Sequence, residues 1–180
     1  MIHYWGPRIW YLLHLISYTY PDFPEEKDKI LYNNFFSNVL PELLPCDYCK
    51  KHFKNYLIEK PVKNNLENKN SLIEWVVKSH NVVNKRHNKK IYTINESHYL
   101  YLHKPINHSM LYSLLKYYSD LSRRQPNNLI KLKEFLKYFI IFFPCISCRN
   151  KLYYYFSNTP NLKILYEKIN NIYRLGMECL

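Results

Sequence analysis

The sequence contains only 2 glycines among 180 residues, and its 10 prolines fall mainly between apolar runs. So few glycines, together with long segments in which apolar residues recur three and four positions apart, favour helices throughout. The clearest of these segments are residues 3–20, residues 110–119 and a segment that begins at Pro126. The hydrophobic fraction of 47% is enough to fill a core. We therefore predict an all-α protein.

Acidic residues are scarce beside basic ones, at 14 against 26, which gives a formal net charge of +12. Such a charge raises the question of nucleic-acid binding. The basic residues, however, are spread along the chain and match no nucleic-acid-binding motif, and the one dense run covers residues 85–90. We interpret this run as a solvated or phosphate-holding face, and we expect no nucleic acid as the main partner.

The chain also lacks the features of a signal peptide at its start and of a membrane span along its length. No basic segment and small-residue cleavage site follow Met1. The longest apolar run, residues 138–143, is stopped by Pro144. We therefore expect a cytoplasmic protein with no membrane span. Structural disulfides are unusual in a reducing cytosol, so cysteine pairs in such a protein point to redox catalysis.

Two of the five cysteines, Cys46 and Cys49, are separated by two residues and directly follow Pro45. Proline suits the first turn of a helix, where its missing N–H costs no hydrogen bond, and residues 53–57 continue with helical apolar spacing. We therefore predict that both cysteines lie at a helix N-terminus. There the helix dipole, helped by the following Lys50 or Lys51, favours a thiolate over a thiol. That is the chemistry of disulfide exchange.

Two segments have the pattern of a helix capping box, Ser71–Glu74 and Thr93–Glu96. The first is predicted to open a helix through Trp75, and the second a short helix to about residue 103. The first helix carries a cluster of polar residues beside Trp75, which we call the polar patch: His80, Asn81 and Asn84. Buried polar groups need partners. A bound polar ligand would supply them, whereas a lone histidine on such a face is more often a core residue with a partner inside the protein.

The cysteine motif occurs twice, because Pro144–Arg149 repeats the pattern of Pro45–Lys50 at an offset of 99 positions. Apolar residues follow both cysteine pairs at matching distances. We interpret this as an internal duplication of a four-helix unit. The second copy lacks the polar patch, since the equivalent positions carry other residue types or lie beyond Leu180. We therefore expect that it does not bind the ligand of the first copy.

The first copy resembles the Erv/ALR family of FAD-linked sulfhydryl oxidases, and in particular the short oxidases of large cytoplasmic DNA viruses. The resemblance covers about residues 4–92. It rests on an ordered set of motifs: Trp5-Gly6, Trp10, Leu13-His14, Tyr20-Pro21, Pro45-Cys46, Cys49, Phe53, Leu57, Ser71-Leu72, Trp75 and His80-Asn81-Val82-Val83-Asn84. The family fold is a four- or five-helix bundle that holds FAD. It implies an oxidase domain over residues 1–95, followed by a degenerate Erv-like helical bundle over residues 104–180.

The resemblance also implies a reaction and the residues that carry it. Cys46 would exchange disulfides with an incoming dithiol protein, such as a thioredoxin-like or CxxC carrier. Cys49 would lie against the isoalloxazine ring as a charge-transfer thiolate, and electrons would pass through FAD to O2 and give H2O2. The residues implied to hold FAD are Gly6, Arg8, Trp10, His14, Cys49, Trp75, His80, Asn81, Asn84, Lys89 and Lys90.

Two positions depart from the family pattern. Many relatives have an arginine directly after the glycine, where this chain has Pro7 and then Arg8. The Leu-Gly pair that precedes the family's lysine is replaced by His87-Asn88.

The second cysteine pair, Cys145 and Cys148, has two interpretations: a retained structural disulfide or a shuttle pair for substrate electrons. Cys179 is the odd cysteine and is either free or paired with another chain. The degenerate half would make the chain an internal pseudo-dimer, with a homodimer of chains as a further arrangement. The rival classes are a zinc-bound Cys₄ module, although we expect no metal, and a catalytically dead interaction scaffold.

Overall fold

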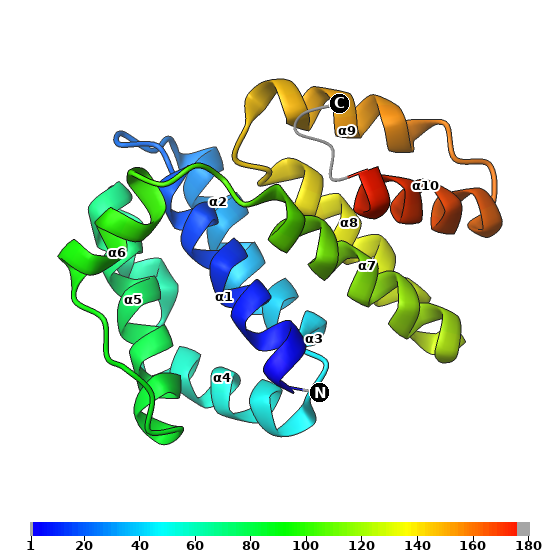
Figure 1. Ribbon diagram of the computed structural model, residues 1–180. Coiled ribbons are helices and arrows are strands. Elements are labelled where there is room, and N and C mark those ends of the chain that lie inside the picture. Colours follow the sequence, from blue (N-terminus) through cyan, green and yellow to red (C-terminus); the bar gives the residue numbers. More distant parts are fainter. Residues whose placement is uncertain (1, 176–180) are drawn as a thin grey trace. The chain divides into compact units, whose positions relative to one another are not determined.

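The computed structural model describes residues 2–175, and every regular element in that range is a helix (Figure 1). The predicted all-α class is therefore confirmed. The chain divides into two compact units. We call residues 13–106 the Cys46 unit, and residues 1–12 with 107–180 the Cys145 unit. The division between them falls inside α1 (Ile2–Tyr18). These units are defined by packing. The domains expected over residues 1–95 and 104–180 are defined by the internal duplication and the family resemblance, and they stay predictions.

The Cys46 unit is assembled around Trp75. The indole ring lies 5.4 Å from the Phe36 ring, 5.7 Å from the Tyr56 ring and 6.4 Å from the Phe53 ring, between centroids. Its Nε1–H donates a 2.8 Å hydrogen bond to the backbone oxygen of Lys60. The helices of this unit after α1 are α2 (Glu26–Asn34), a π-helix (Phe35–Val39), α3 (Leu40–Leu43), α4 (Asp47–Glu59), a 3₁₀ turn (Val62–Asn65), α5 (Lys69–Arg86) and α6 (Ile94–Leu102).

The capping box predicted at Ser71–Glu74 is wrong, because the N-cap of α5 lies three residues earlier. Asn68 is the N-cap, and its side-chain oxygen accepts hydrogen bonds from the Ser71 N–H at 3.0 Å and from the Ser71 hydroxyl at 3.2 Å. Asparagine is at least as good a cap as serine, and the earlier start adds most of a turn to the helix. The box predicted at Thr93–Glu96 is confirmed, with both reciprocal hydrogen bonds present at the start of α6.

The turn that ends α5 depends on Asn88, which has a positive φ of 50°. The Lys89 N–H bonds to the Asn84 oxygen at 2.8 Å, and the Asn88 N–H bonds to the Lys85 oxygen at 3.2 Å. This is a Schellman motif, in which the left-handed position favours glycine and, after it, asparagine. Asn88 thus replaces the family's glycine with the residue type best able to keep the same backbone.

The Cys145 unit contains α7 (His108–Arg124), a 3₁₀ turn (Pro126–Asn128), α8 (Leu129–Ile141), α9 (Ile146–Ser157) and α10 (Leu162–Leu175). Helix α7 packs against α8 and α10, and α8 packs against α9 (Figure 1). The Tyr118 and Phe135 rings stack with centroids 4.1 Å apart in the core of this unit. The first part of α1 also belongs to this unit, and Arg8 Nε there donates to Ser113 Oγ at 2.6 Å.

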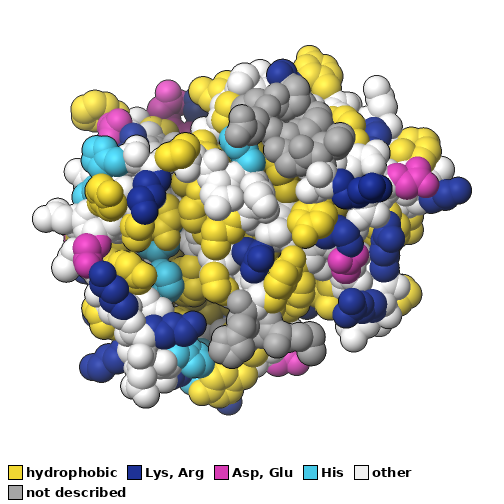
Figure 2. All heavy atoms as spheres, in the orientation of Figure 1, with side chains coloured by type: hydrophobic (Ala, Val, Ile, Leu, Met, Phe, Trp, Pro, Cys, Tyr) yellow, Lys and Arg dark blue, Asp and Glu magenta, His cyan; other side chains and the backbone are white. Residues whose placement is uncertain are grey.

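Basic side chains are scattered among other types over the face drawn in Figure 2. No helix within residues 2–175 is long and apolar enough to cross a membrane.

We predict that Asn88→Ala lowers the free energy of unfolding by about 1 kcal/mol, because alanine is strained at positive φ. Asn88→Gly should change it by less than about 0.5 kcal/mol. The measurement is urea unfolding followed by circular dichroism. The matched control is Asn158→Ala at the end of α9, where φ is −95°. Equal effects of the two alanine variants would contradict the account of this turn.

Candidate active site

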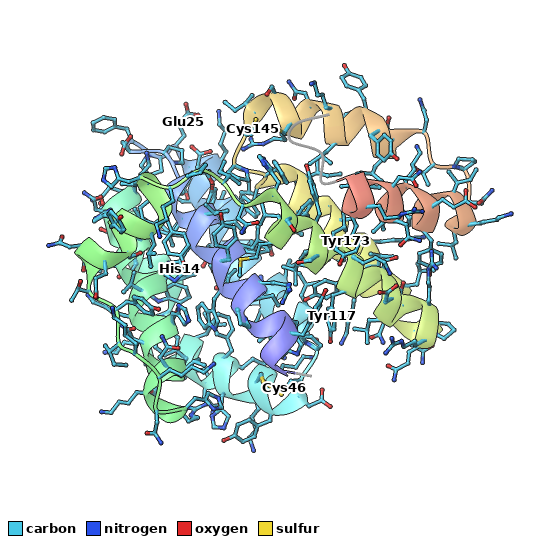
Figure 3. The ribbon with its side chains drawn as sticks, in the orientation of Figure 1. His14, Glu25, Cys46, Tyr117, Cys145 and Tyr173 are labelled. Carbon is cyan, nitrogen blue, oxygen red and sulfur yellow. A yellow bond between two sulfur atoms is a disulfide. The ribbon has the colours of Figure 1, made fainter. Side chains whose placement is uncertain are left out.

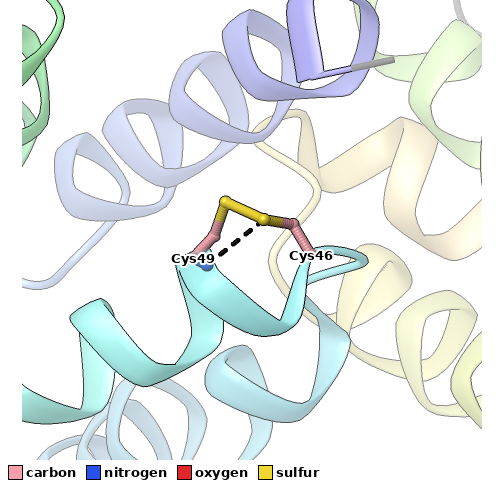
Figure 4. Close-up of a disulfide and its surroundings, with 2 residues drawn as sticks. All are labelled: Cys46 and Cys49. Atoms are coloured by element: carbon pink, nitrogen blue, oxygen red, sulfur yellow. Dashed lines mark hydrogen bonds between the residues drawn. A yellow bond between two sulfur atoms is a disulfide. The ribbon is translucent and has the colours of Figure 1, made fainter.

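The cysteine pair begins α4. Cys46 is the N-cap, and its sulfur accepts a 3.2 Å hydrogen bond from the Cys49 N–H (Figure 4). The two cysteines form a disulfide, with their Cα atoms 5.2 Å apart. The predicted helix N-terminus is confirmed, but the expectation that Pro45 lies in the first turn is wrong. Pro45 precedes the cap, since the Cys46 side chain itself occupies the capping position.

The charge around this pair differs from expectation at Lys50. Its ammonium group binds the Glu42 carboxylate of α3, which also binds Lys54 at 2.7 Å. Hydrogen bonds from Lys50 and Lys54 lower the pKa of Glu42 to about 2. The Lys50 charge is therefore shared with a carboxylate, so it stabilises a thiolate less than an unpaired ammonium would, while the N-terminus of α4 still favours the thiolate.

The polar patch extends to α1 through two histidines. His14 Nε2 lies 2.9 Å from His80 Nδ1, which joins α1 to α5 by a hydrogen bond (Figure 3 labels His14). Burial, and then the nearby His80, lower the pKa of His14 to about 3. Burial, and then the charge of Lys89, lower the pKa of His80 to about 4. Both imidazoles are therefore neutral at pH 7, and in their hydrogen bond one ring nitrogen donates and the other accepts.

Two tyrosines outside the predicted site stack on these histidines. The Tyr101 ring of α6 is nearly parallel to His14 with centroids 4.4 Å apart, and the Tyr92 ring is 6.3 Å from His80. The Thr93 capping box indicated the helix that carries Tyr101. No local sequence signal predicts that the Tyr101 ring meets α1, because that contact depends on how α6 packs.

Asn81 uses its side chain to hold the segment after α5. Its Nδ2–H donates to the Tyr92 oxygen at 2.8 Å, and its Oδ1 accepts from the Tyr92 N–H at 3.0 Å. This segment carries both predicted phosphate-binding lysines. Lys90 forms an ion pair with Glu96 at 2.7 Å, whereas Lys89 is close enough to His80 to lower its pKa. Asn81 thus positions this segment. Its partner, the backbone of Tyr92, could not be predicted from the sequence.

The sequence-predicted site residues are divided between the two units. Those in the Cys46 unit are Cys46, Cys49, His14, Trp75, His80, Asn81, Asn84, Lys89 and Lys90, and those in the Cys145 unit are Gly6, Arg8 and Trp10. Arg8 binds the Tyr4 oxygen and Ser113, both within its own unit. Gly6 directly precedes Pro7. A Cβ at the position before a proline disfavours helical backbone, so the local backbone also explains why glycine stands there. The cofactor roles of all these residues stay predictions.

The donor set fits FAD, a ligand with flat aromatic rings and a diphosphate. The Cys46 unit contains aromatic rings that can stack. It also contains neutral imidazoles and the buried Asn84 amide, which can hydrogen-bond, and Lys89 lies near His80. Within residues 2–175, no group of three histidine, cysteine or acidic side chains could hold a metal ion.

Comparison with known families bears directly on this site. The model of the Erv1 / Alr family matches residues 7–101, which is more than half of the chain. The chain belongs to the Erv1/Alr family. The match includes both Cys46 and Cys49 and the whole polar patch, and it extends to Tyr101. It does not reach Cys145, so the predicted degenerate second copy stays a prediction.

Viral relatives and a yeast structure agree with this Erv1/Alr membership. A FAD-linked sulfhydryl oxidase of African swine fever virus (isolate Pig/Kenya/KEN-50/1950) is 38% identical over 101 residues, which cover 56% of this chain and 82% of that protein. A probable FAD-linked sulfhydryl oxidase of Acanthamoeba polyphaga mimivirus is 34% identical over 52% of this chain and 65% of its own. The crystal structure of the yeast Erv1 core matches with a TM-score of 0.53 and 28% identity, over 56% of this chain and 83% of that chain.

We predict that acid weakens the fold through the two buried histidines. Their pKa values of about 3 and about 4 lie below the ordinary value of about 6.5. Between the folded and the ordinary pKa, the unfolded chain therefore binds more protons than the folded chain does. Their contribution to stability is complete above pH 6.5 and is lost as the pH falls towards 3. A His14→Gln/His80→Gln variant should therefore lose less stability between pH 7 and pH 5 than the parent does. Urea midpoints at both pH values measure this.

The control for this prediction is the exposed His87, replaced by glutamine in the same way. The urea midpoint of the His87→Gln variant should change between pH 7 and pH 5 as that of the parent does. If the double variant also matched the parent, the two imidazoles would not be held neutral.

Proposed function

We propose that this chain is an FAD-linked sulfhydryl oxidase that makes disulfides in protein substrates. The observation that carries the proposal is the Cys46–Cys49 disulfide at the N-terminus of α4, inside the segment that matches the Erv1/Alr family. The viral relatives named FAD-linked sulfhydryl oxidases match over the same segment.

The exchange step follows from the position of the two sulfurs. A substrate thiolate attacks the Cys46 sulfur, the S–S bond breaks, and Cys49 leaves as a thiolate. The second substrate thiol loses its proton and attacks the mixed disulfide, which releases Cys46 and completes the substrate disulfide. The helix N-terminus stabilises the thiolates that form. Tyr48 is 60% exposed between the two cysteines, so a polypeptide substrate can approach the pair.

FAD, when bound, supplies the two-electron oxidation that restores the disulfide, and it passes the electrons to O2 to give H2O2. Aromatic and neutral polar groups of the Cys46 unit would hold its rings: His14, Trp75, His80 and Asn84. Asn81 would position the segment that carries Lys89, and Lys89 would face the phosphates. The family resemblance supplies the rest of the set. These residues are Cys49 as the flavin-facing sulfur, and Gly6, Arg8, Trp10 and Lys90 as cofactor contacts.

We also propose the substrates, the location and the role of the Cys145 unit. The substrates are dithiol proteins, with a thioredoxin-like or CxxC carrier as one form. The location is the cytoplasm of an infected cell, the virion, or both. The Cys145 unit would be the flavin-free degenerate copy of an internal pseudo-dimer, and a homodimer of chains is the further arrangement. One FAD per chain is then expected, and two per chain would contradict it. Cys179 lies outside the described residues.

Oxygen consumption with dithiothreitol as substrate tests the oxidase. We predict that Cys46→Ser and Cys49→Ser each lower turnover at least about a hundredfold, because either change removes the exchanging pair. The Cys145→Ser/Cys148→Ser variant is the control, and it should keep oxidising this small dithiol. A flavin-free protein that consumes no oxygen would instead favour the scaffold or zinc alternatives.

A pair of neighbouring lysines tests how the phosphates are held. We predict that Lys89→Gln weakens FAD binding about tenfold, through loss of a charge-assisted hydrogen bond. Lys90→Gln should have a smaller effect, because Lys90 is already paired with Glu96. Titration of apoprotein with FAD, followed by flavin fluorescence, gives both affinities. An independent readout is the pKa of His80, which should rise in Lys89→Gln alone. Equal losses of affinity would contradict the assignment.

A further inference from the structure

The first part of α4 carries an aromatic pair beside the two cysteines. The Tyr48 ring lies edge-on to the His52 ring, about one helical turn further along α4, with centroids 4.1 Å apart. Tyr48 is 60% exposed, and His52 is partly exposed. Tyrosine offers a large contact area at a low cost in side-chain entropy, and it is enriched at protein interfaces. Because Tyr48 lies between the two cysteines in the chain, a polypeptide that reaches Cys46 (labelled in Figure 3) meets these rings.

Arg86 approaches the same aromatic pair from α5. It follows Trp75 by eleven residues, which is about three helical turns, so the two side chains lie on the same face of α5. That face packs against α4, because the Trp75 ring packs against Phe53 and Tyr56. Burial, and then the charge of Arg86, lower the pKa of His52. The last turn of α5 thus brings a guanidinium group to the first part of α4.

The charges in the first part of α4 do not cancel. Lys50 and Lys54 share one carboxylate, that of Glu42 in α3. Lys51 is exposed, and Asp47 in the first turn carries the opposite charge. The cationic side chains therefore outnumber the acidic ones beside the exchanging sulfurs.

The guanidinium group of α5 adds to this excess of positive charge. We call the resulting surface the basic rim, and it consists of Lys50, Lys51, Lys54 and Arg86. A surface of one sign attracts partners of the opposite sign and repels those of its own, mainly through the rate of association. The basic rim therefore favours an acidic partner at the place where disulfide exchange occurs.

Arg86 also has a local role, which it shares with Lys85. Both lie in the last turn of α5, where a cation interacts favourably with the helix dipole, and both are exposed. Successive residues of a helix point about 100° apart, so Lys85 does not share the face that Arg86 turns towards α4. Lys85 is therefore a matched control, with the same charge and the same effect on the helix end.

We propose that Tyr48 and the basic rim form the docking surface for the substrates of this protein, and that this surface selects polypeptides with acidic residues beside their cysteine pair. Tyr48 packs on the substrate chain, and Lys51 and Arg86 pair with its carboxylates. The proposal rests on the proposed function, in which Cys46 and Cys49 are the exchanging pair.

The exchange that follows docking is balanced in atoms and electrons. The S–S bond between Cys46 and Cys49 breaks, and an S–S bond forms in the substrate. The substrate loses two electrons and two protons, and the Cys46–Cys49 pair gains them. This step uses neither oxygen nor flavin, so docking can be measured apart from the oxidase.

The test measures how fast the full chain oxidises reduced peptides at pH 7 without oxygen, with mass spectrometry of the peptides as the readout. The peptides share one Cys-x-x-Cys sequence, flanked by glutamates, glutamines or lysines. Each rate is divided by the rate of the same peptide with hydroxyethyl disulfide, an uncharged reagent, which corrects for differences in thiol reactivity. The Cys46→Ser/Cys49→Ser variant gives the background from the other cysteines.

We call the corrected rate of the acidic peptide, divided by that of the basic peptide, the preference. At about 0.01 M salt we expect a preference of at least about tenfold, and at about 1 M salt a preference below about threefold, because salt screens exposed charges. A preference of one, a faster basic peptide, or no oxidation above background would each overturn the proposal.

Three variants locate the effect on the basic rim. Arg86→Gln should lower the preference about threefold, which is the size of one exposed ion pair. Arg86→Lys keeps the charge and should keep most of the preference, and Lys85→Gln should leave it unchanged. Equal losses in Arg86→Gln and Lys85→Gln would show an effect of net charge alone and would contradict the assignment.

Oxygen consumption by the unmutated chain with dithiothreitol, an uncharged dithiol, reports the oxidase separately. Oxygen consumption without a preference among the peptides would overturn the docking surface alone. A preference among the peptides without oxygen consumption would overturn the oxidase alone.

Discussion

The hydrogen bond from the Cys49 N–H to the Cys46 sulfur is the interaction on which the candidate site depends. It makes a cysteine side chain the cap of α4, because an N-cap side chain can accept from the backbone N–H three residues on, which here belongs to Cys49. The same spacing brings the two sulfurs together across the first turn, where the helix dipole favours negative charge on either of them. Helix initiation and redox chemistry therefore use the same atoms, and replacing Cys46 affects both.

The polar patch adds a second constraint, which is that two imidazoles must stay neutral. His14 and His80 bond to each other across α1 and α5, and burial holds both pKa values far below neutrality. Lys89 strengthens this effect at His80. The Lys89 charge is compatible with the histidine pair as long as neither ring takes a proton, which links the fold of the Cys46 unit to pH.

The sequence predicted the main elements because their signals are local. The CxxC spacing, the Thr93 box and the helical periodicity each depend on neighbouring residues, and the structure confirms them. The start of α5 was missed because Asn68 is a competing cap three residues before Ser71. The partners of Asn81 and the stacking of Tyr101 on His14 could not be predicted, since they join residues that are far apart in the chain and depend on packing. The family motifs predicted more candidate site residues than periodicity did, and the cofactor roles of those residues stay predictions.

An anaerobic titration of the FAD-loaded protein with a dithiol tests the central claim most directly, since it asks whether the cysteine pair and the flavin exchange electrons. The account predicts that the main flavin absorbance band bleaches as dithiol is added, and that it does not bleach in a Cys46→Ser/Cys49→Ser variant that still holds FAD. Reduction of the Cys46–Cys49 disulfide with the flavin band unchanged would contradict the account.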